Sequence, residues 1–188
     1  DFCLSRGLGD VYKRQIYMNP METDDIVLRK AKFEDWESMH KNVWSRPETA
    51  KYMQWQITKT EESAKERIKK TITYQKTHDT YLIYEKEHGQ AIGFAGVEEI
   101  SPHIFQDAGI ALVPEYTGKG LGKQTLQLLL EYCANTLRGK EFFYSTRGNN
   151  KISKALALSC GFSYQYSEEK IDLKNKEPYI LEVYSRKL

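Results

Sequence analysis

The feature that most constrains the fold is a glycine-rich junction between a predicted strand and a predicted helix. The strand, residues 107–113, runs through Pro114-Glu115-Tyr116 into a segment that we call the glycine loop, residues 117–123 (TGKGLGK). Three glycines at alternate positions allow backbone conformations that a Cβ would forbid. Their N–H groups can converge on an anion at the positive end of the following helix, and two lysines add positive charge. The junction predicts a diphosphate-binding loop.

Two familiar phosphate-binding patterns do not fit this loop. The pattern G-x-x-x-x-G-K-[ST], placed on Gly122 and Lys123, would require glycine at Thr117 and a hydroxyl at Gln124. The pattern G-x-G-x-x-G would require glycine at Lys123 or Thr125, depending on its register. The structural alternative is a turn that only tightens a strand–helix junction.

Hydrophobic periodicity along the chain predicts one mixed α/β (α+β) domain. The order β-α-α-β-β-β-α-β-α-β-β indicates a central, mostly antiparallel sheet with helices on both faces. Ser45 is the expected N-cap of a short helix and Thr60 that of a longer one, which should end near residues 78–79. Expected strands are 26–31, 81–84, 91–97, 106–113, 142–145, 162–173 and 179–184; expected helices are 33–43, 61–78, 121–133 and 150–159.

The first stretch of the sequence does not match this pattern. Residues 1–15 (DFCLSRGLGDVYKRQ) show neither strand alternation nor an apolar helical face. They resemble translated adapter or vector sequence, and we place the native start at Met18 or Met21. We therefore expect a leader over residues 1–17 and a folded domain over residues 18–188.

Composition excludes several classes of protein. Hydrophobic residues make up 40% of the chain, and 13 Tyr, 7 Phe and 3 Trp supply too much packing material for a disordered protein. A formal charge of +2 is too small for a dedicated nucleic-acid binder, and no apolar run reaches the roughly 18 residues of a membrane span. Cys3, Cys133 and Cys160 have no disulfide or metal-ligand spacing, which predicts reduced thiols, no metal and a cytoplasmic protein.

Two motifs resemble those of the GNAT superfamily of acetyl-CoA-dependent N-acetyltransferases. The family signature Arg/Gln-x-x-Gly-x-Gly/Ala, after a strand that ends in Pro-x-Tyr, is met from Pro114 to Gly122, with Thr117 at the Arg/Gln position. A second signature, Asn followed eleven residues later by Gly-Phe, is met by Asn150 and Gly161-Phe162. The likeness runs from about Ile26 to the C-terminus. It looks most like the ribosomal-protein alanine N-acetyltransferase (RimJ/RimL-type) branch.

The resemblance implies a site for acetyl-CoA as acyl donor. It implies backbone contacts to the pantetheine arm from Ile110, Ala111 and Leu112, and a contact from Asn150 to the pantetheine or thiol end. It implies that the diphosphate is held by Gly118, Lys119, Gly120, Leu121, Gly122 and Lys123. Asp107 is the candidate general base, with Glu98 and Glu99 as rivals, and Ser153 is the candidate general acid. Ala157 stands where many relatives carry a catalytic tyrosine, and Ser145 where one subgroup carries a glutamate base.

We therefore expect an acetyltransferase acting on a primary amine, either a peptide N-terminus or a small molecule. The alternatives are a non-catalytic acyl-CoA sensor and a plain interaction domain. Aromatic residues near the expected acceptor side, Tyr52, Trp55 and Tyr74, are explained at least as well by core packing. We expect a monomer or homodimer without nucleic-acid or membrane partners.

Overall fold

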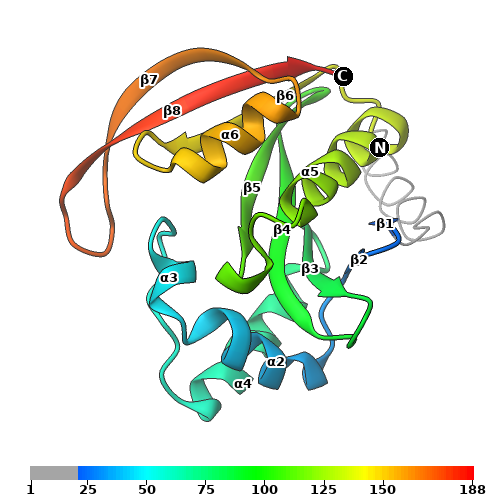
Figure 1. The fold of residues 1–188 in the computed structure, drawn as a ribbon, viewed down its shortest axis with the longest axis vertical. Helices are drawn as coiled ribbons and strands as arrows, with labels where there is room; N and C mark the ends of the chain where they lie inside the picture. Colours follow the sequence, from blue (N-terminus) through cyan, green and yellow to red (C-terminus); the bar gives the residue numbers. More distant parts are fainter. Residues whose placement is uncertain (1–20) are drawn as a thin grey trace, which may run out of the picture.

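The protein is described by a computed structural model that covers residues 21–188, so the predicted leader, the predicted start and Cys3 lie outside the described residues. Within that range, eight strands form one sheet in the order β1-β2-β3-β4-β5-β6-β8-β7 (Figure 1). Every neighbouring pair is antiparallel except β5 and β6, which are parallel. The mostly antiparallel sheet predicted from the sequence is confirmed.

The expected order of elements is found, except that a two-residue strand is added at the start and three α-helices, not two, lie between β2 and β3. The strands are β1 (Met21–Glu22), β2 (Ile26–Arg29), β3 (Asp79–Glu85), β4 (Ala91–Ser101), β5 (Ile104–Leu112), β6 (Glu141–Arg147), β7 (Ser163–Ile171) and β8 (Pro178–Lys187). The α-helices are α2 (Trp36–Met39), α3 (Pro47–Ala50), α4 (Glu61–Tyr74), α5 (Leu121–Glu131) and α6 (Lys151–Ser159). Short helical turns η1 (Phe33–Asp35), η2 (His40–Trp44), η3 (Pro114–Tyr116) and η4 (Tyr132–Thr136) extend or join them.

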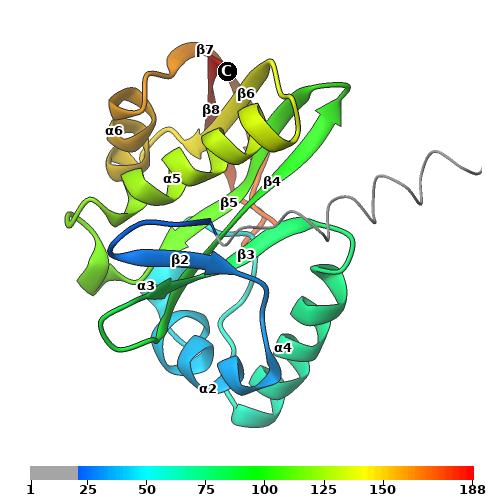
Figure 2. The ribbon, with the colours of Figure 1, turned by 90° about the vertical axis from the view of Figure 1, so that its right-hand side faces the viewer.

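Helices cover both faces of the sheet, as predicted. Figure 2 shows α5 and α6 on one side of the central strands and α2 and α4 on the other. The N-cap of α4 is Thr60, whose hydroxyl accepts the N–H of Ser63 at 3.2 Å. The predicted N-cap Ser45 is wrong, because α3 starts one residue later than expected and Arg46 occupies the cap. Pro47 takes the first helical position, where its missing N–H leaves no bond unmade.

The core lies between the sheet and the helices on each face. Its largest fully buried side chains include Tyr81 of β3, Phe105 of β5 and Phe142 of β6. Cys133 and Cys160 are buried and unbridged, which confirms the prediction of free thiols at these two positions. Among the described residues, none of the helices has the length and hydropathy needed to cross a membrane.

Strands β5 and β6 diverge after a short contact, and this divergence positions the site. They pair only from Ile104–Glu141 to Gln106–Phe143. Beyond Gln106, β5 pairs with β4 alone, through a register shift opposite Gly109, whose φ is +96°. A bulge of this kind bends and twists a strand. We call the wedge between the diverging strands the seam.

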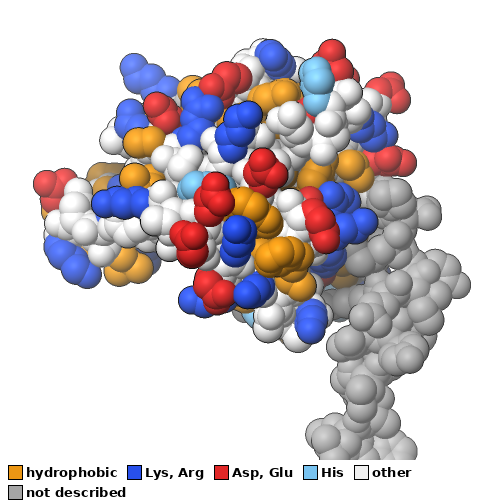
Figure 3. All heavy atoms as spheres, turned by 90° about the horizontal axis from the view of Figure 1, so that it is seen from below, with side chains coloured by type: hydrophobic (Ala, Val, Ile, Leu, Met, Phe, Trp, Pro, Cys, Tyr) orange, Lys and Arg blue, Asp and Glu red, His pale blue; other side chains and the backbone are white. Residues whose placement is uncertain are grey.

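The surface is mixed in charge. On the face drawn in Figure 3, basic and acidic side chains alternate over short distances around a small apolar area. This pattern agrees with the near-neutral net charge of +2.

Candidate active site

A cavity of about 490 Å³ opens at the seam. Its walls are β5, the glycine loop, α6, and residues 48–53 in and after α3. Most of the residues that the sequence assigned to the cofactor line it: Ile110, Ala111, Leu112, Gly118, Gly120, Gly122, Lys123 and Asn150, together with the candidate acid Ser153. The topology therefore brings together two motifs that lie about thirty residues apart in the chain.

The glycine loop presents a row of free amides. Gly118 and Gly120 have φ angles of +78° and +82°, a region that favours glycine. The first loop-to-helix bond runs from the N–H of Gln124 to the carbonyl of Gly120 at 3.0 Å. Within residues 21–188, none of the six N–H groups from Gly118 to Lys123 has an acceptor. These donors at the N-terminus of α5 fit a diphosphate, which needs several N–H groups and a positive potential.

Two residues of the predicted diphosphate set do not line the cavity with their side chains. The Lys119 ammonium lies 4.9 Å from the centre of the Tyr116 ring, outside the wall of the cavity. Leu121 is the first residue of α5, and its side chain is buried in the core. The prediction for these two residues therefore rests on their backbone N–H groups.

Asn150 and β5 form another part of the cavity wall. Asn150 is the N-cap of α6, and its Oδ1 accepts the N–H of Ser153 at 3.2 Å. Its Nδ2 has no hydrogen-bond partner among the described residues and borders the cavity. On β5, residues 110–112 lie beyond the last pair with β6, so one strand edge faces the seam. An extended ligand can add along such an edge.

Asp107 sits where β5 and β6 separate. Its Oδ1 accepts the N–H of Ser145 on β6 at 2.8 Å and lies 3.5 Å from the Ser145 hydroxyl. Burial raises the pKa of Asp107 to about 6, although the N–H groups of Ser145 and Gly109 oppose this rise. The carboxyl group thus combines a fixed position in the seam with a pKa near that of a biological general base.

Ser153 is paired with a residue that the sequence analysis missed. Its Oγ lies 2.8 Å from the hydroxyl of Tyr144, a β6 residue that also lines the cavity and is only 3% exposed. Burial raises the pKa of Tyr144, and the negative charge of Asp107 raises it further. In the sequence, Tyr144 is the last of three consecutive aromatic residues in a predicted strand, which gives no sign of a polar contact.

The rival bases and the other aromatic residues lie elsewhere. Glu98 accepts a hydrogen bond from the Gln106 side chain at 3.0 Å, and Glu99 accepts the N–H of His103 at 3.0 Å. Both are exposed at the end of β4 and, like Asp107, neither is among the residues that line the cavity. Of the three aromatic residues near the expected acceptor side, Tyr52 lines the cavity, whereas Trp55 packs near Phe94 and Tyr74 stacks on His78.

Contacts between distant segments lie beside the cavity, because Arg147 donates at 3.2 Å to the carbonyl of Tyr52, which lines it. The turn between β7 and β8 reaches the segment after α3 (Figure 1). Gln54 donates to the Tyr179 hydroxyl at 3.1 Å and accepts the N–H of Leu173 at 3.0 Å. The guanidinium of Arg147 pairs with Asp172 at 2.6 Å and lies 4.1 Å from the centre of the Tyr179 ring. We call these contacts the hairpin closure.

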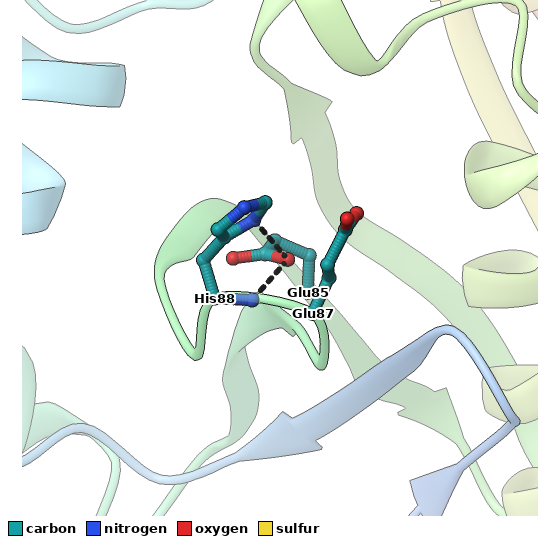
Figure 4. A group of neighbouring side chains, drawn as sticks. All are labelled: Glu85, Glu87 and His88. Atoms are coloured by element: carbon teal, nitrogen blue, oxygen red, sulfur yellow. Dashed lines mark hydrogen bonds and ion pairs between the residues drawn. The ribbon is translucent and has the colours of Figure 1, made fainter.

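One group of potential metal ligands lies outside the cavity. Among the described residues, Glu85, Glu87 and His88 bring three ligand atoms within 4.8 Å of one another (Figure 4). Glu85 accepts the N–H groups of His88 and Gln90 at 2.9 and 3.1 Å, which closes the β3–β4 turn. Burial alone would raise the pKa of Glu85, but these N–H groups hold it below its usual value. The turn accounts for the position of this carboxylate.

Comparisons with known proteins identify the family. Residues 25–163 match the acetyltransferase (GNAT) domain. No curated protein matches the sequence. The match to the domain covers well over half of the chain and includes the glycine loop, Asp107, Asn150 and Ser153, whereas it ends where β7 begins.

Several solved structures share the fold at low sequence identity. A GNAT-family acetyltransferase from Bacillus anthracis superposes with a TM-score of 0.76 at 18% identity, over 88% of this chain and 96% of the other. An acetyltransferase from Salmonella typhimurium that modifies the N-terminal serine of ribosomal protein L7/L12 gives 0.74 at 21% identity, over 90% and 98%. The microcin C7 self-immunity acetyltransferase, solved with acetyl-CoA and AMP, gives 0.76 at 21% identity, over 88% and 94%. The chain therefore belongs to the GNAT acetyltransferase family and is an acetyl-CoA-dependent acyltransferase.

Proposed function

We propose that the protein transfers the acetyl group of acetyl-CoA to a primary amine, with a peptide N-terminus as the favoured acceptor. The observation that carries the proposal is the set of six free N–H groups from Gly118 to Lys123, beside a cavity that also reaches Asn150. These amides would hold the diphosphate, and the β5 edge at residues 110–112 would hold the pantetheine arm. When bound, acetyl-CoA supplies the acetyl thioester.

Asp107 is the proposed general base. An amine attacks only in its neutral form, so a group in the seam must take up its proton, directly or through a water molecule. With a pKa of about 6, most of the Asp107 side chains are ionised at pH 7 and can accept one. Oδ1 accepts the N–H of Ser145, which holds the carboxylate in the seam.

Ser153 is the proposed hydrogen-bond donor to the departing thiol. It stands in the first turn of α6, where the positive end of the helix favours a negative charge. Its hydroxyl borders the cavity that would hold the thiol end of the donor. Ala157, one turn further along, is fully buried and offers no hydroxyl.

A peptide N-terminus is favoured by the likeness to the branch that acetylates ribosomal proteins. The Salmonella enzyme of similar fold modifies an N-terminal serine. The acceptor end of the cavity carries Glu48 and Tyr52, and an acidic group there favours a cationic amine. The two buried free cysteines accord with the reducing cytoplasm, where ribosomal proteins are made.

Thiol release across a panel of amines tests the proposal. The panel contains peptides that begin with Ala or Ser, the same peptides with blocked N-termini, a polyamine and an aminoglycoside. We expect thiol release and a mass increase of one acetyl group only with free N-terminal peptides, and none with Gly120→Glu, which places an anion against the diphosphate site. Thiol release with the polyamine or aminoglycoside alone would refute the peptide assignment. If none of the amines in the panel caused thiol release, transfer to amines would be refuted.

A further inference from the structure

In the Tyr144–Ser153 pair either hydroxyl could donate, and we assign the direction from their acidities. A phenol is a stronger acid than an aliphatic alcohol, so it is the better hydrogen-bond donor of the two at 2.8 Å. Tyr144 is 3% exposed, and burial next to a carboxylate keeps its hydroxyl protonated over the working pH range. The phenolic hydrogen therefore points at Ser153 Oγ.

This direction leaves the hydrogen of Ser153 available to a ligand. The Ser153 N–H is used by Asn150 at 3.2 Å, and Tyr144 is the only partner of the Ser153 hydroxyl among the described residues. Because Oγ accepts from the phenol, its own hydrogen is free to be donated into the cavity that both side chains line. Without Tyr144, the hydroxyl would rotate among several acceptors and solvent.

We propose that Tyr144 is a positioning residue, which by donating to Ser153 directs the serine hydroxyl at the sulfur that leaves during acetyl transfer. The inference rests on the proposed role of Ser153 at the departing thiol. When the bond between the acetyl carbon and sulfur breaks, its electron pair stays on sulfur, and the Ser153 O–H stabilises that charge by a hydrogen bond. No proton leaves Ser153, so no alkoxide forms. In this chain the phenol of the site comes from β6, whereas Ala157 removes the one expected from α6.

The sulfur contact can be measured without turnover. Isothermal titration calorimetry compares the affinity of CoA with that of desulfo-CoA, the analogue that lacks the sulfur atom, between pH 7 and pH 9. We expect the wild-type protein to prefer CoA increasingly as the thiol ionises, by about tenfold at pH 9, because a hydrogen bond to a charged group is stronger than one to a neutral group. Tyr144→Phe and Ser153→Ala should each remove most of this preference.

The double variant and a matched control separate positioning from structure. If Tyr144 acts through Ser153, the double variant loses no more of the preference, and no more kcat, than Ser153→Ala alone. Tyr184→Phe is the control: Tyr184 pairs with Tyr144 across β6 and β8, is equally buried, and donates its hydroxyl to Glu182 at 2.5 Å, away from the cavity wall. This variant should keep both the preference for CoA and kcat.

The possible failures differ. A normal preference in Tyr144→Phe with a lost preference in Ser153→Ala would overturn the inference and leave the role of Ser153 intact. A normal preference in Ser153→Ala would refute that role, and with it the inference, while acetyl-CoA binding stands. An equal loss in Tyr184→Phe would show that the effect of Tyr144 is structural.

Discussion

Replacing Asp107 by Asn separates its chemical role from its structural one. In the wild-type protein the N–H of Ser145 lies 2.8 Å from Oδ1 of Asp107. The amide keeps an oxygen that can accept this N–H, so the contact between β5 and β6 is retained. The amide cannot take a proton from the amine. General-base help is typically worth about 10²–10⁴-fold, so we expect kcat to fall within that range while the KM for acetyl-CoA changes little.

The pH dependence follows from the pKa of about 6. Roughly nine-tenths of the Asp107 side chains are ionised at pH 7 and roughly one-tenth at pH 5. In the wild-type protein kcat should therefore fall about tenfold between these values, and the fall should be absent from Asp107→Asn. Thiol release at saturating amine and acetyl-CoA from pH 5 to pH 8 measures both. Glu98→Gln, at an exposed carboxylate outside the cavity, is the control and should leave the profile unchanged.

Stability gives an independent measurement of the same group. Because burial raises the pKa, the folded protein binds this proton more tightly than the unfolded chain does. The contribution of Asp107 to folding is therefore most favourable below about pH 4 and is lost as the pH rises through about 6. Asp107→Asn should gain stability relative to the wild type between pH 4 and pH 7, as measured by urea unfolding. Full activity of Asp107→Asn across the pH range would eliminate Asp107 as the base.

Four further substitutions test the loop, the cofactor strand and the hairpin closure. A Cβ at Gly93 would lie 2.1 Å from a backbone oxygen of β5, so Gly93→Ala must displace that strand by about 0.9 Å to reach a distance of 3.0 Å. We expect the free energy of unfolding, measured in urea, to fall by about 1–3 kcal/mol, and acetyl-CoA binding, measured by calorimetry, to weaken. Gly120→Glu should abolish that binding; unchanged affinity would mean that the site is misplaced. Gly122→Ala meets only ordinary contacts of 3.6 Å or more and should keep affinity while adding about 0.5–1 kcal/mol to unfolding. Asp172→Asn weakens the 2.6 Å ion pair with Arg147, so the KM for the acceptor should rise while that for acetyl-CoA does not; equal changes in both would contradict a role on the acceptor side.

Local signals in the sequence predicted the elements and the cofactor loop. The cap Thr60 and the glycine loop depend on residues within a few positions of one another, so both can be predicted from spacing alone. The prediction of Ser45 as N-cap failed by one residue. The backbone at Arg46 is extended and the helix begins at Pro47, so Arg46 is the N-cap.

Long-range contacts account for what the sequence could not predict. The bond from Asp107 to Ser145 joins residues 38 positions apart and depends on where β5 and β6 stop pairing. Tyr144 lies on the buried face of β6 with Phe142 and Thr146, so its pattern is that of a core residue, and only the packing of α6 brings Ser153 against it. Alternation of apolar residues predicts which face of a strand is buried. It does not predict a hydrogen bond made by one side chain on that face.

The short pairing of β5 with β6 also has a mechanical consequence. The sheet consists of a five-stranded block and a three-stranded block, joined edge to edge by three residue pairs and the Asp107 bond. Acetyl-CoA lodged in the wedge would touch α5 on the first block and α6 on the second, and so brace the two against relative rotation. Amide hydrogen exchange should then slow on both sides of the junction when the donor binds, and the acceptor would meet a stiffer enzyme than the donor did.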